Sequence, residues 1–334
     1  MDEAQAIKNI KSARAAAIRQ LKSIFTISLT GTPLENHIGE YYSIIDVALP
    51  GLLPDYKKFM AIAKTGDLEQ IVKKMNTFVL RRTKNAILKE LPPKVESNIV
   101  LEMTSKQKKV YATMVTEIKR AIDLAYTTKT GAQANIIALT ALLRLRQICV
   151  SPQLVDKQSS SDAPKIDYLT ETLTELVSEG NAALVFSQFI MSLDMIEKSL
   201  LEAGLKVYRI DGSTSMAQRK KIVESFQRND DNVCILLLSL KTGGVGLNLT
   251  RANYVFHVEP WWNPAVENQA SDRSHRIGQN KTVFVTRLVM RHSIEEKMMA
   301  LKEEKQKLFN DIMENVANKT TSLLSKKDFD LLLE

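Results

Sequence analysis

Two arginines in this sequence have the spacing and the chemistry to act on a polyphosphate. Arg273 and Arg276 lie in the stretch QASDRSHRIGQ, residues 269–279. A guanidinium is planar, always charged and able to donate two parallel hydrogen bonds to phosphate oxygens. Such a group stabilises the charge that spreads over the phosphoryl oxygens, and an arginine finger accelerates phosphoryl transfer by roughly 10³–10⁵. The alternative is an exposed helix face on which Asp272 and Arg276 form a salt bridge.

A strand, a turn and a helix should position these arginines. The apolar run YVFHVE, residues 254–259, predicts the strand, Pro260 the turn and Asn263-Pro264 the start of the helix. Spacing of three and four residues places four polar side chains on one face of that helix: Gln269, Asp272, Arg273 and Arg276. We therefore expect the arginines on a helix at the mouth of a sheet.

A glycine-rich segment follows another apolar run. SLKTGGVGLNLT, residues 239–250, contains Gly243, Gly244 and Gly246. Glycines allow backbone amides to approach a phosphate closely and to adopt positive φ. The loop is not a Walker A loop, because G-x-x-x-x-G-K-[ST] occurs nowhere in the 334 residues. By itself the segment is equally consistent with a tight turn.

Two further segments carry weaker signals. LTGTPLEN, residues 29–36, is an apolar run that ends in a turn of hydroxyl and glycine residues. Asp2-Glu3-Ala4-Gln5 offers two adjacent carboxylates, which could hold Mg²⁺ through its water shell and orient an attacking water. A charged chain start is the alternative for the second.

The second half of the sequence predicts a parallel sheet covered on both faces. The Ser-rich stretch KQSSSDAP, residues 157–164, is the best linker, and short apolar runs alternate with helices after it. The expected strands are 182–186, 206–210, 233–239, 254–258 and 283–288. The expected helices are 166–178, 192–202, 216–227 and 293–313. The fold class is therefore α/β.

The first half predicts fewer strands. Residues 10–22 favour a helix, and SIFTISLT, residues 23–30, favours a strand. The pattern from residue 55 to residue 150 is mostly helical. Thr104 and Ser105 can cap one long helix, and Gly131 separates it from a second.

The composition of the chain indicates which classes of partner and ligand to expect. The net charge of +8 and the sequence pI of about 9.2 permit an anionic partner such as nucleic acid. The two cysteines, Cys149 and Cys234, are expected to be free thiols, and the scattered histidines predict no structural metal. Because no apolar run reaches about 18 residues, we expect no membrane partner.

Taken together and in this order, the segments resemble the Swi/Snf-type helicase-like ATPases, most closely the compact prokaryotic members. DEAQ resembles the Walker B box, LTGTP motif III, SLKTGGVGLNLT motif V and QASDRSHRIGQ motif VI. FVLRRTKNAILKELPPK at 78–94, LRQICVSPQL at 145–154 and LVFSQF at 184–189 resemble further family segments, the last being motif IV. The resemblance covers residues 2–310.

The resemblance implies a RecA-like motor lobe two preceded by a helical protrusion and part of lobe one. The implied domains are 1–50 for lobe one, 51–156 for the protrusion, 157–164 for the linker, 165–310 for lobe two and 311–334 for a helical tail. ATP and Mg²⁺ would bind between the two lobes of the intact motor, and double-stranded DNA would be the track.

The family roles transfer to matching positions. Arg273 and Arg276 match the arginine fingers, and Asp2 and Glu3 match the carboxylates that hold Mg²⁺ and activate water. Trp262 matches a tryptophan that tracks DNA, with packing at the helix start as its alternative role. Nucleotide contacts are implied for Gln269, Gly243, Gly244 and Gly246, and DNA contacts for Ser239, Lys241, Thr242 and Trp262. Glu259 departs from the family, which usually has Asp there.

The implied function is the C-terminal motor half of an ATP-dependent double-stranded-DNA translocase. The family is a DNA-dependent ATPase, but we expect this chain alone to be inactive, because the Walker A loop is absent and the sequence begins inside the Walker B box. The alternative is a non-catalytic DNA- or partner-binding module from a split or truncated gene, with lobe one on a separate chain. The expected location is the bacterial cytoplasm, at the nucleoid, or the nucleus in a eukaryote.

Overall fold

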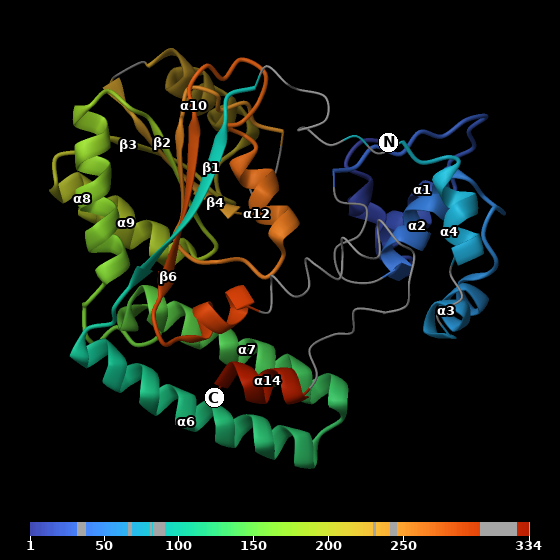
Figure 1. Cartoon of the computed structure of the whole chain (residues 1–334), viewed down its shortest axis with the longest axis horizontal. Coiled ribbons are helices and arrows are strands. Elements are labelled where there is room, and N and C mark those ends of the chain that lie inside the picture. Colours follow the sequence, from blue (N-terminus) through green and yellow to red (C-terminus); the bar gives the residue numbers. More distant parts are fainter. Residues whose placement is uncertain are drawn as a thin grey trace. The chain divides into compact units, whose positions relative to one another are not determined.

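The chain divides into two units, which are described separately (Figure 1). The computed structural model describes residues 1–31, 38–65, 69–80, 82, 91–229, 232–240, 246–300 and 326–333. Unit 1 lies within residues 1–88. Unit 2 lies within residues 89–300 and includes the C-terminal helix α14 (Lys326–Leu333).

A six-stranded sheet forms the centre of unit 2, and all its pairings are parallel. The order is β1 (Lys94–Leu101), β6 (Val283–Met290), β5 (Tyr254–His257), β2 (Ala183–Ser187), β4 (Ile235–Ser239) and β3 (Val207–Ile210). Every residue of β2 and β4 is buried. Strands that are apolar throughout belong to sheets covered on both faces, so the expected α/β class is confirmed.

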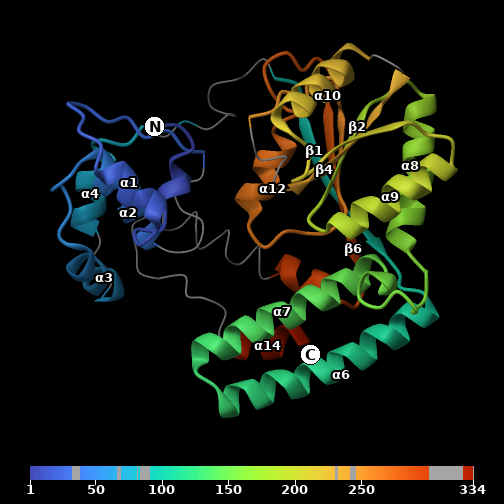
Figure 2. The same ribbon diagram turned by 180° about the vertical axis from the view of Figure 1, so that it is seen from behind.

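Helices cover both faces of this sheet, as Figures 1 and 2 show. α8 (Pro164–Ser178) and α9 (Ile190–Glu202) pack on one face through buried leucines and isoleucines. α10 (Met216–Arg228) and α12 (Pro264–Ser271) pack on the other, through Phe226 and Ala270. These helices begin within two residues of where the sequence places them, because their apolar faces have a clear helical period.

Strand β1 was not expected, since residues 55–150 predict mostly helix. It pairs with β6 along eight residues, from Lys94 opposite Val283 to Leu101 opposite Met290. β1 is an edge strand with mostly exposed or half-buried side chains, so its sequence lacks the apolar run of a buried strand. Its partner is far away in the sequence, 189 residues at the Ser97–Thr286 pair. The domain boundaries drawn from the sequence remain predictions.

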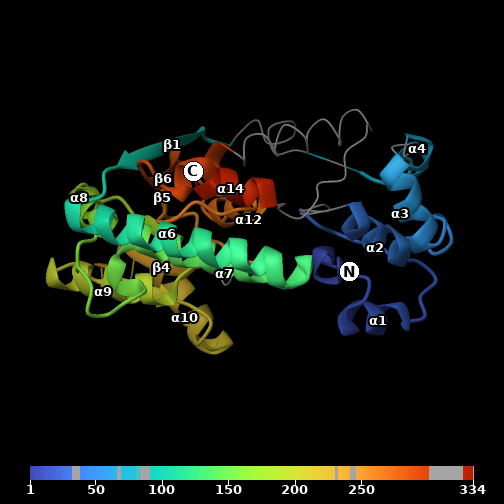
Figure 3. The same ribbon diagram turned by 90° about the horizontal axis from the view of Figure 1, so that it is seen from below.

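A helical hairpin lies between β1 and α8. It consists of α6 (Ser105–Thr128) and α7 (Gly131–Val150), followed by the short helix η2 (Pro152–Leu154). Thr104 is the cap of α6, and its side chain accepts a hydrogen bond from Gln107 N at 3.1 Å. Thr104 also donates to Asp162 in the predicted linker at 2.5 Å. Figure 3 shows α6 and α7 side by side, and α14 packs on α6.

Unit 1 is helical in its described residues. It contains η1 (Ala4–Ile7), α1 (Ala13–Arg19), α2 (Ile38–Ala48), α3 (Tyr56–Thr65) and α4 (Glu69–Asn76). Its core gathers Ile38, Tyr42, Ile45, Phe59 and Met75.

The strand expected at residues 23–30 is wrong. This segment forms no strand, and Ile24 and Phe25 are exposed. Two backbone hydrogen bonds, from Leu29 N to Met1 O and from Ala4 N to Leu29 O, hold its end against the chain start. A strand requires a ladder with a neighbouring strand, and β-branched side chains do not supply one. The described residues of unit 1 contain no strand that could pair with it.

Both cysteines are free thiols, as the sequence predicts. Cys149 is fully buried in α7, and burial raises the pKa of its thiol. Of the described helices, none has the length and apolar character required to cross a membrane.

Candidate functional site

The two candidate arginines follow α12 rather than lie on it. The helix begins at Pro264, as predicted, but it ends at Ser271, and residues 272–279 form successive turns. The expectation of one shared helix face is therefore wrong, and only Gln269 lies on the helix. Polar side chains compete with the helix at its end: Ser271 Oγ donates to Glu267 O, and Ser274 Oγ to Ala252 O.

The turn 272–279 packs against residues 247–252, which follow the last glycine of the glycine-rich segment, Gly246. Leu249 N donates to Arg273 O at 3.0 Å, and Arg276 NH1 to Leu247 O at 3.5 Å. Gln279 Nε2 donates to Thr250 O and Ala252 O, both at 2.9 Å. The structure thus brings together two segments in which the sequence suggested phosphate chemistry. The contact lies beside the amino end of β5.

The two arginines differ in exposure. Arg273 is 2% exposed, whereas Arg276 is half-buried. A guanidinium must reach solvent to meet a ligand, so Arg276 is the better placed of the two. Gly246, in the preceding segment, has a φ of 44°, a left-handed conformation that favours glycine.

The other predicted nucleotide and DNA residues are described only in part. Lys241, Thr242, Gly243 and Gly244 lie outside the described residues. Ser239 ends β4 and is 6% exposed.

A buried carboxylate, Glu259, joins the ends of two strands. Its Oε1 accepts a hydrogen bond from Ser187 Oγ at 2.7 Å, and its Oε2 accepts one from Gln188 N at 3.1 Å. Ser187 ends β2, and Glu259 follows β5. Burial raises the pKa of Glu259, against the charge of Lys165 and the two hydrogen bonds. The carboxylate fixes the loops at the carboxyl edge of the sheet.

Replacing Glu259 with glutamine should change how stability depends on pH. Because the pKa of Glu259 is higher in the folded than in the unfolded chain, the wild-type protein loses stability as pH rises through that folded pKa. Glu259→Gln lacks this loss, so its urea midpoint relative to wild type should rise as pH increases above about 4, the ordinary value for a glutamate carboxyl. A difference that is constant with pH would contradict the prediction, and Glu224→Gln, at an exposed position on α10, is the control.

The tryptophan pair after Glu259 has two different environments. Trp262, the residue selected from the sequence, is half-buried. Trp261 packs against the core of unit 2 and faces the guanidinium of Arg146, whose Cζ lies 5.9 Å from its ring centroid. Arg146 comes from α7 and was not among the candidate residues. Its position within an apolar helix, RLRQICV, could have marked it, because a charged residue between apolar neighbours is a candidate for a buried polar contact.

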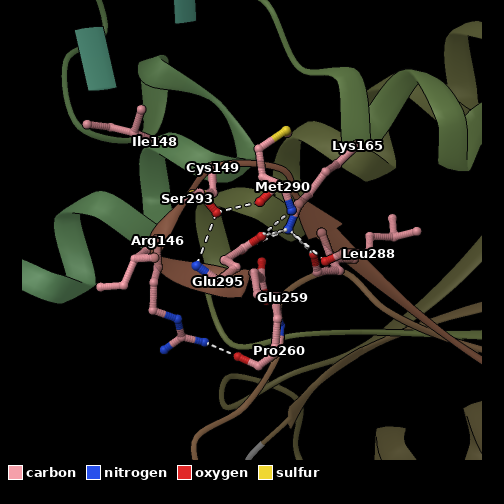
Figure 4. Close-up of polar contacts among 12 residues, drawn as sticks. Arg146, Ile148, Cys149, Lys165, Glu259, Pro260, Leu288, Met290, Ser293 and Glu295 are labelled. Atoms are coloured by element: carbon pink, nitrogen blue, oxygen red, sulfur yellow. Dashed lines mark hydrogen bonds and ion pairs between the residues drawn. The ribbon is translucent and has the colours of Figure 1, made fainter. Parts of the chain in front are cut away.

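A fully buried ion pair lies, like Glu259, at the carboxyl edge of the sheet (Figure 4). Lys165 Nζ contacts Glu295 Oε2 at 2.7 Å, and both side chains are 0% exposed. Lys165 also donates to Val258 O at 2.7 Å and to Leu288 O at 2.9 Å, while Glu295 Oε2 accepts from Met290 N at 2.9 Å. No local sequence signal identifies this pair, since its members are 130 residues apart.

A second ion-pair network holds α12 against the sheet. Glu267 is 0% exposed and accepts hydrogen bonds from Arg287 Nε on β6 and from Trp261 N. Arg287 NH2 also donates to Glu96 on β1 at 2.6 Å. Because α12 leads directly into the turn 272–279, this network fixes the helix that positions Arg276.

The acidic pair at the chain start lies in unit 1. Asp2 and Glu3 are exposed, and Glu3 Oε2 accepts from Gln5 Nε2 at 2.5 Å. Gln5 Oε1 accepts from Thr30 Oγ1 at 2.6 Å, so the DEAQ and LTGTP segments lie together. Described residues contain no group of three or more His, Cys, Asp or Glu suited to a metal. Two exposed carboxylates still fit Mg²⁺, which usually takes one or two together with water and phosphate oxygens.

Comparisons with known proteins show which families and structures this chain resembles. The sequence matches the SNF2-related domain over residues 1–154 and the helicase conserved C-terminal domain over residues 164–278. A Mycoplasma pneumoniae protein described as an ATP-dependent helicase is 36% identical over 331 residues, covering 98% of this chain and 32% of the relative. A Bacillus subtilis protein described as an ATP-dependent helicase/translocase is 37% identical over 331 residues, covering 94% of this chain and 35% of the relative.

The chain therefore spans about a third of the length of these relatives. Among solved structures, the Sulfolobus solfataricus SWI2/SNF2 ATPase core in complex with double-stranded DNA is similar, with a TM-score of 0.60 and 33% identity. That match covers 100% of this chain and 72% of the Sulfolobus chain. The sheet of unit 2 is accordingly RecA-like, as the sequence resemblance implied.

Proposed function

Because the chain belongs to the SWI/SNF family of ATP-dependent helicases, we propose that it is the C-terminal motor half of a translocase that hydrolyses ATP to move along double-stranded DNA. The observation that carries this proposal is the packing of the turn 272–279 against residues 247–252. It joins the segment that bears Arg276 to the segment that follows the glycines. We expect movement along the duplex without strand separation.

In this proposal Arg276 and Arg273 are the arginine fingers. Arg276 is half-buried and, among the described residues, donates one hydrogen bond, to Leu247 O; its other N–H groups would meet phosphate oxygens. Arg273 is buried and its carbonyl accepts a hydrogen bond from Leu249 N, so its finger role requires that the guanidinium become exposed when ATP binds. Gln269 on α12 and the glycines Gly243, Gly244 and Gly246 contact the nucleotide.

DNA is bound through its phosphates. Ser239, Lys241 and Thr242 contact the backbone, and Trp262 tracks the strand. The half-buried position of Trp262 and the net charge of +8 support this assignment. Asp2 and Glu3 would hold Mg²⁺, which neutralises charge on the phosphates when it is bound.

Residues 1–334 alone should hydrolyse ATP at a negligible rate. They contain no G-x-x-x-x-G-K-[ST] loop, so this polypeptide has no lysine cradle for the β- and γ-phosphates. Adding a lobe-one segment that carries this loop, on the same or a separate chain, should restore turnover that duplex DNA stimulates. We call this combination the reconstituted motor. ATP turnover is measured for both proteins with and without duplex DNA.

These measurements test the expected inactivity, the translocase assignment and the DNA contacts separately. Robust DNA-stimulated hydrolysis by residues 1–334 alone would contradict the expected inactivity. A reconstituted motor without DNA-stimulated turnover would contradict the translocase assignment. Duplex binding by residues 1–334 should weaken steeply with salt, because phosphate contacts release counterions. Binding that does not change with salt would contradict the proposed backbone contacts.

We also propose that the protein works in the bacterial cytoplasm, at the nucleoid, or in the nucleus if its source is a eukaryote. The similarity to bacterial helicases and the proposed DNA track support this location. Imaging of a fluorescently tagged protein with a DNA stain tests it, and exclusion from the DNA would contradict it.

A further inference from the structure

One buried guanidinium joins the helical hairpin to two loops at the carboxyl edge of the sheet. Arg146 lies on α7 and is 1% exposed. Its NH2 group donates to Pro260 O at 2.5 Å, a contact drawn in Figure 4. Its NH1 group donates to Gln188 Oε1 at 3.0 Å. Three elements that are distant in sequence therefore meet at one side chain.

Aromatic rings complete the environment of this guanidinium. The Cζ of Arg146 lies 5.9 Å from the ring centroid of Phe189 and 5.9 Å from that of Trp261. A cation at this distance from an aromatic face is attracted by the ring, and more strongly where water is excluded. Burial lowers the pKa of Arg146, and the charge of Glu259 opposes this effect. Glu259 in turn accepts hydrogen bonds from Ser187 and Gln188, so it also ties the same two loops together.

Each loop leads directly into a helix. Residues 187–189 precede α9, which begins at Ile190, and residues 258–263 precede α12, which begins at Pro264. A displacement of the second loop would move Trp262 and the start of α12 together. α12 ends at Ser271, immediately before the turn that contains Arg276.

We propose that Arg146 is a positioning residue that locks these two loops to the helical hairpin. The lock keeps a fixed geometry between Trp262 and the turn with Arg276, and so sets how far DNA moves for each ATP hydrolysed. The second part rests on the proposed function, whereas the locking of the loops does not.

The two tryptophans of the chain both lie in the second loop, so intrinsic fluorescence reports on it directly. A Trp262→Phe background leaves Trp261 as the only indole, and a Trp261→Phe background leaves Trp262. Arg146→Met removes both hydrogen bonds and keeps a stem of similar length without a buried charge. Arg146→Lys keeps a charge but cannot donate in the same two directions. Arg144→Gln, exposed on the same helix, is the matched control.

We expect both Arg146 variants to shift the emission of Trp261 to longer wavelength and to raise its acrylamide quenching constant several-fold. Trp262 should change in the same direction in its own background. The far-UV circular dichroism of Arg146→Lys should match wild type, which separates a released loop from an unfolded chain. Unchanged emission and quenching of both indoles in a folded variant would overturn the proposal.

The coupling role is tested on the reconstituted motor by the ratio of base pairs moved to ATP hydrolysed. Both rates scale with the amount of folded protein, so a purely structural loss leaves this ratio unchanged. Arg146→Lys should lower the ratio several-fold, and Arg144→Gln should not. Equal losses of movement and hydrolysis would overturn the coupling role. A wild-type reconstituted motor that does not move DNA would overturn the proposed function and, with it, the coupling role. The fluorescence of Trp261 and Trp262 would still test whether Arg146 locks the loops, because that measurement does not depend on the motor.

Discussion

Replacing Arg276 with alanine in the reconstituted motor should lower kcat for DNA-stimulated ATP hydrolysis by about 10³-fold or more, the range in which arginine fingers act. Its half-buried guanidinium is the one that the structure leaves accessible beside residues 247–252, whereas Arg273 is buried. The loss should fall on kcat, because in the proposed function this arginine stabilises charge that develops during the transfer. Steady-state turnover at saturating ATP and duplex DNA measures it.

Two controls test whether the effect requires a guanidinium and whether it requires position 276. Arg276→Lys should restore only a small part of the rate, since an ammonium lacks the planar pair of donors. Arg228→Ala, on the exposed end of α10, should leave kcat unchanged. Thermal unfolding of Arg276→Ala should match wild type, because its hydrogen bond to Leu247 O is long at 3.5 Å. A kcat within a few-fold of wild type in the folded Arg276→Ala variant would remove Arg276 from the catalytic machinery.

Replacing Lys165 with methionine should destabilise unit 2 by about 3–5 kcal/mol, the cost of leaving one member of a buried ion pair without its partner. Glu295, at 0% exposure, would lose its cationic partner, and Val258 O and Leu288 O would each lose a donor. For a unit of this size the melting temperature should fall by roughly 6–20 °C. Chemical denaturation monitored by circular dichroism gives the change in the free energy of unfolding.

A double-mutant cycle identifies the cause of that loss. Lys165→Met combined with Glu295→Gln should be less destabilised than the sum of the two single variants, because the second change removes the isolated charge. Lys198→Met, which breaks an exposed pair with Glu202 on α9, should change stability by no more than about 0.5 kcal/mol. Additive single losses would mean that the pair contributes through packing rather than through charge.

The sheet was predictable where local sequence determines the environment. β2 and β4 are apolar along their whole length, and only a strand covered on both faces has that composition. The start of α12 followed from Pro264, whose fixed φ suits the first turn of a helix. The sequence singled out both segments that the structure brings together, 239–250 and 269–279, but it did not predict their contact through Arg276 and Leu247.

The remaining features depend on contacts between distant residues. The end of α12 was missed because Ser274 bonds to Ala252, a partner on another segment. Arg146 and Lys165 have roles that depend on Pro260 and Glu295, which no local pattern connects to them. Conversely, residues 23–30 have the composition of a strand but lack a neighbour to pair with among the described residues of unit 1.

The position of β1 determines where an expression fragment of this protein should begin. A fragment cut at the Ser-rich segment, which the sequence marks as the natural border, would begin after β1 and lose the strand that covers β6. Arg287 would lose Glu96, and the backbone of the apolar strand VFVTRLVM would be left open at the rim of the sheet. Open strands of this kind recruit other chains. An expression fragment that starts ahead of Lys94 keeps β1 paired with β6 as the edge strand, so recombinant yields of soluble protein should depend on that choice.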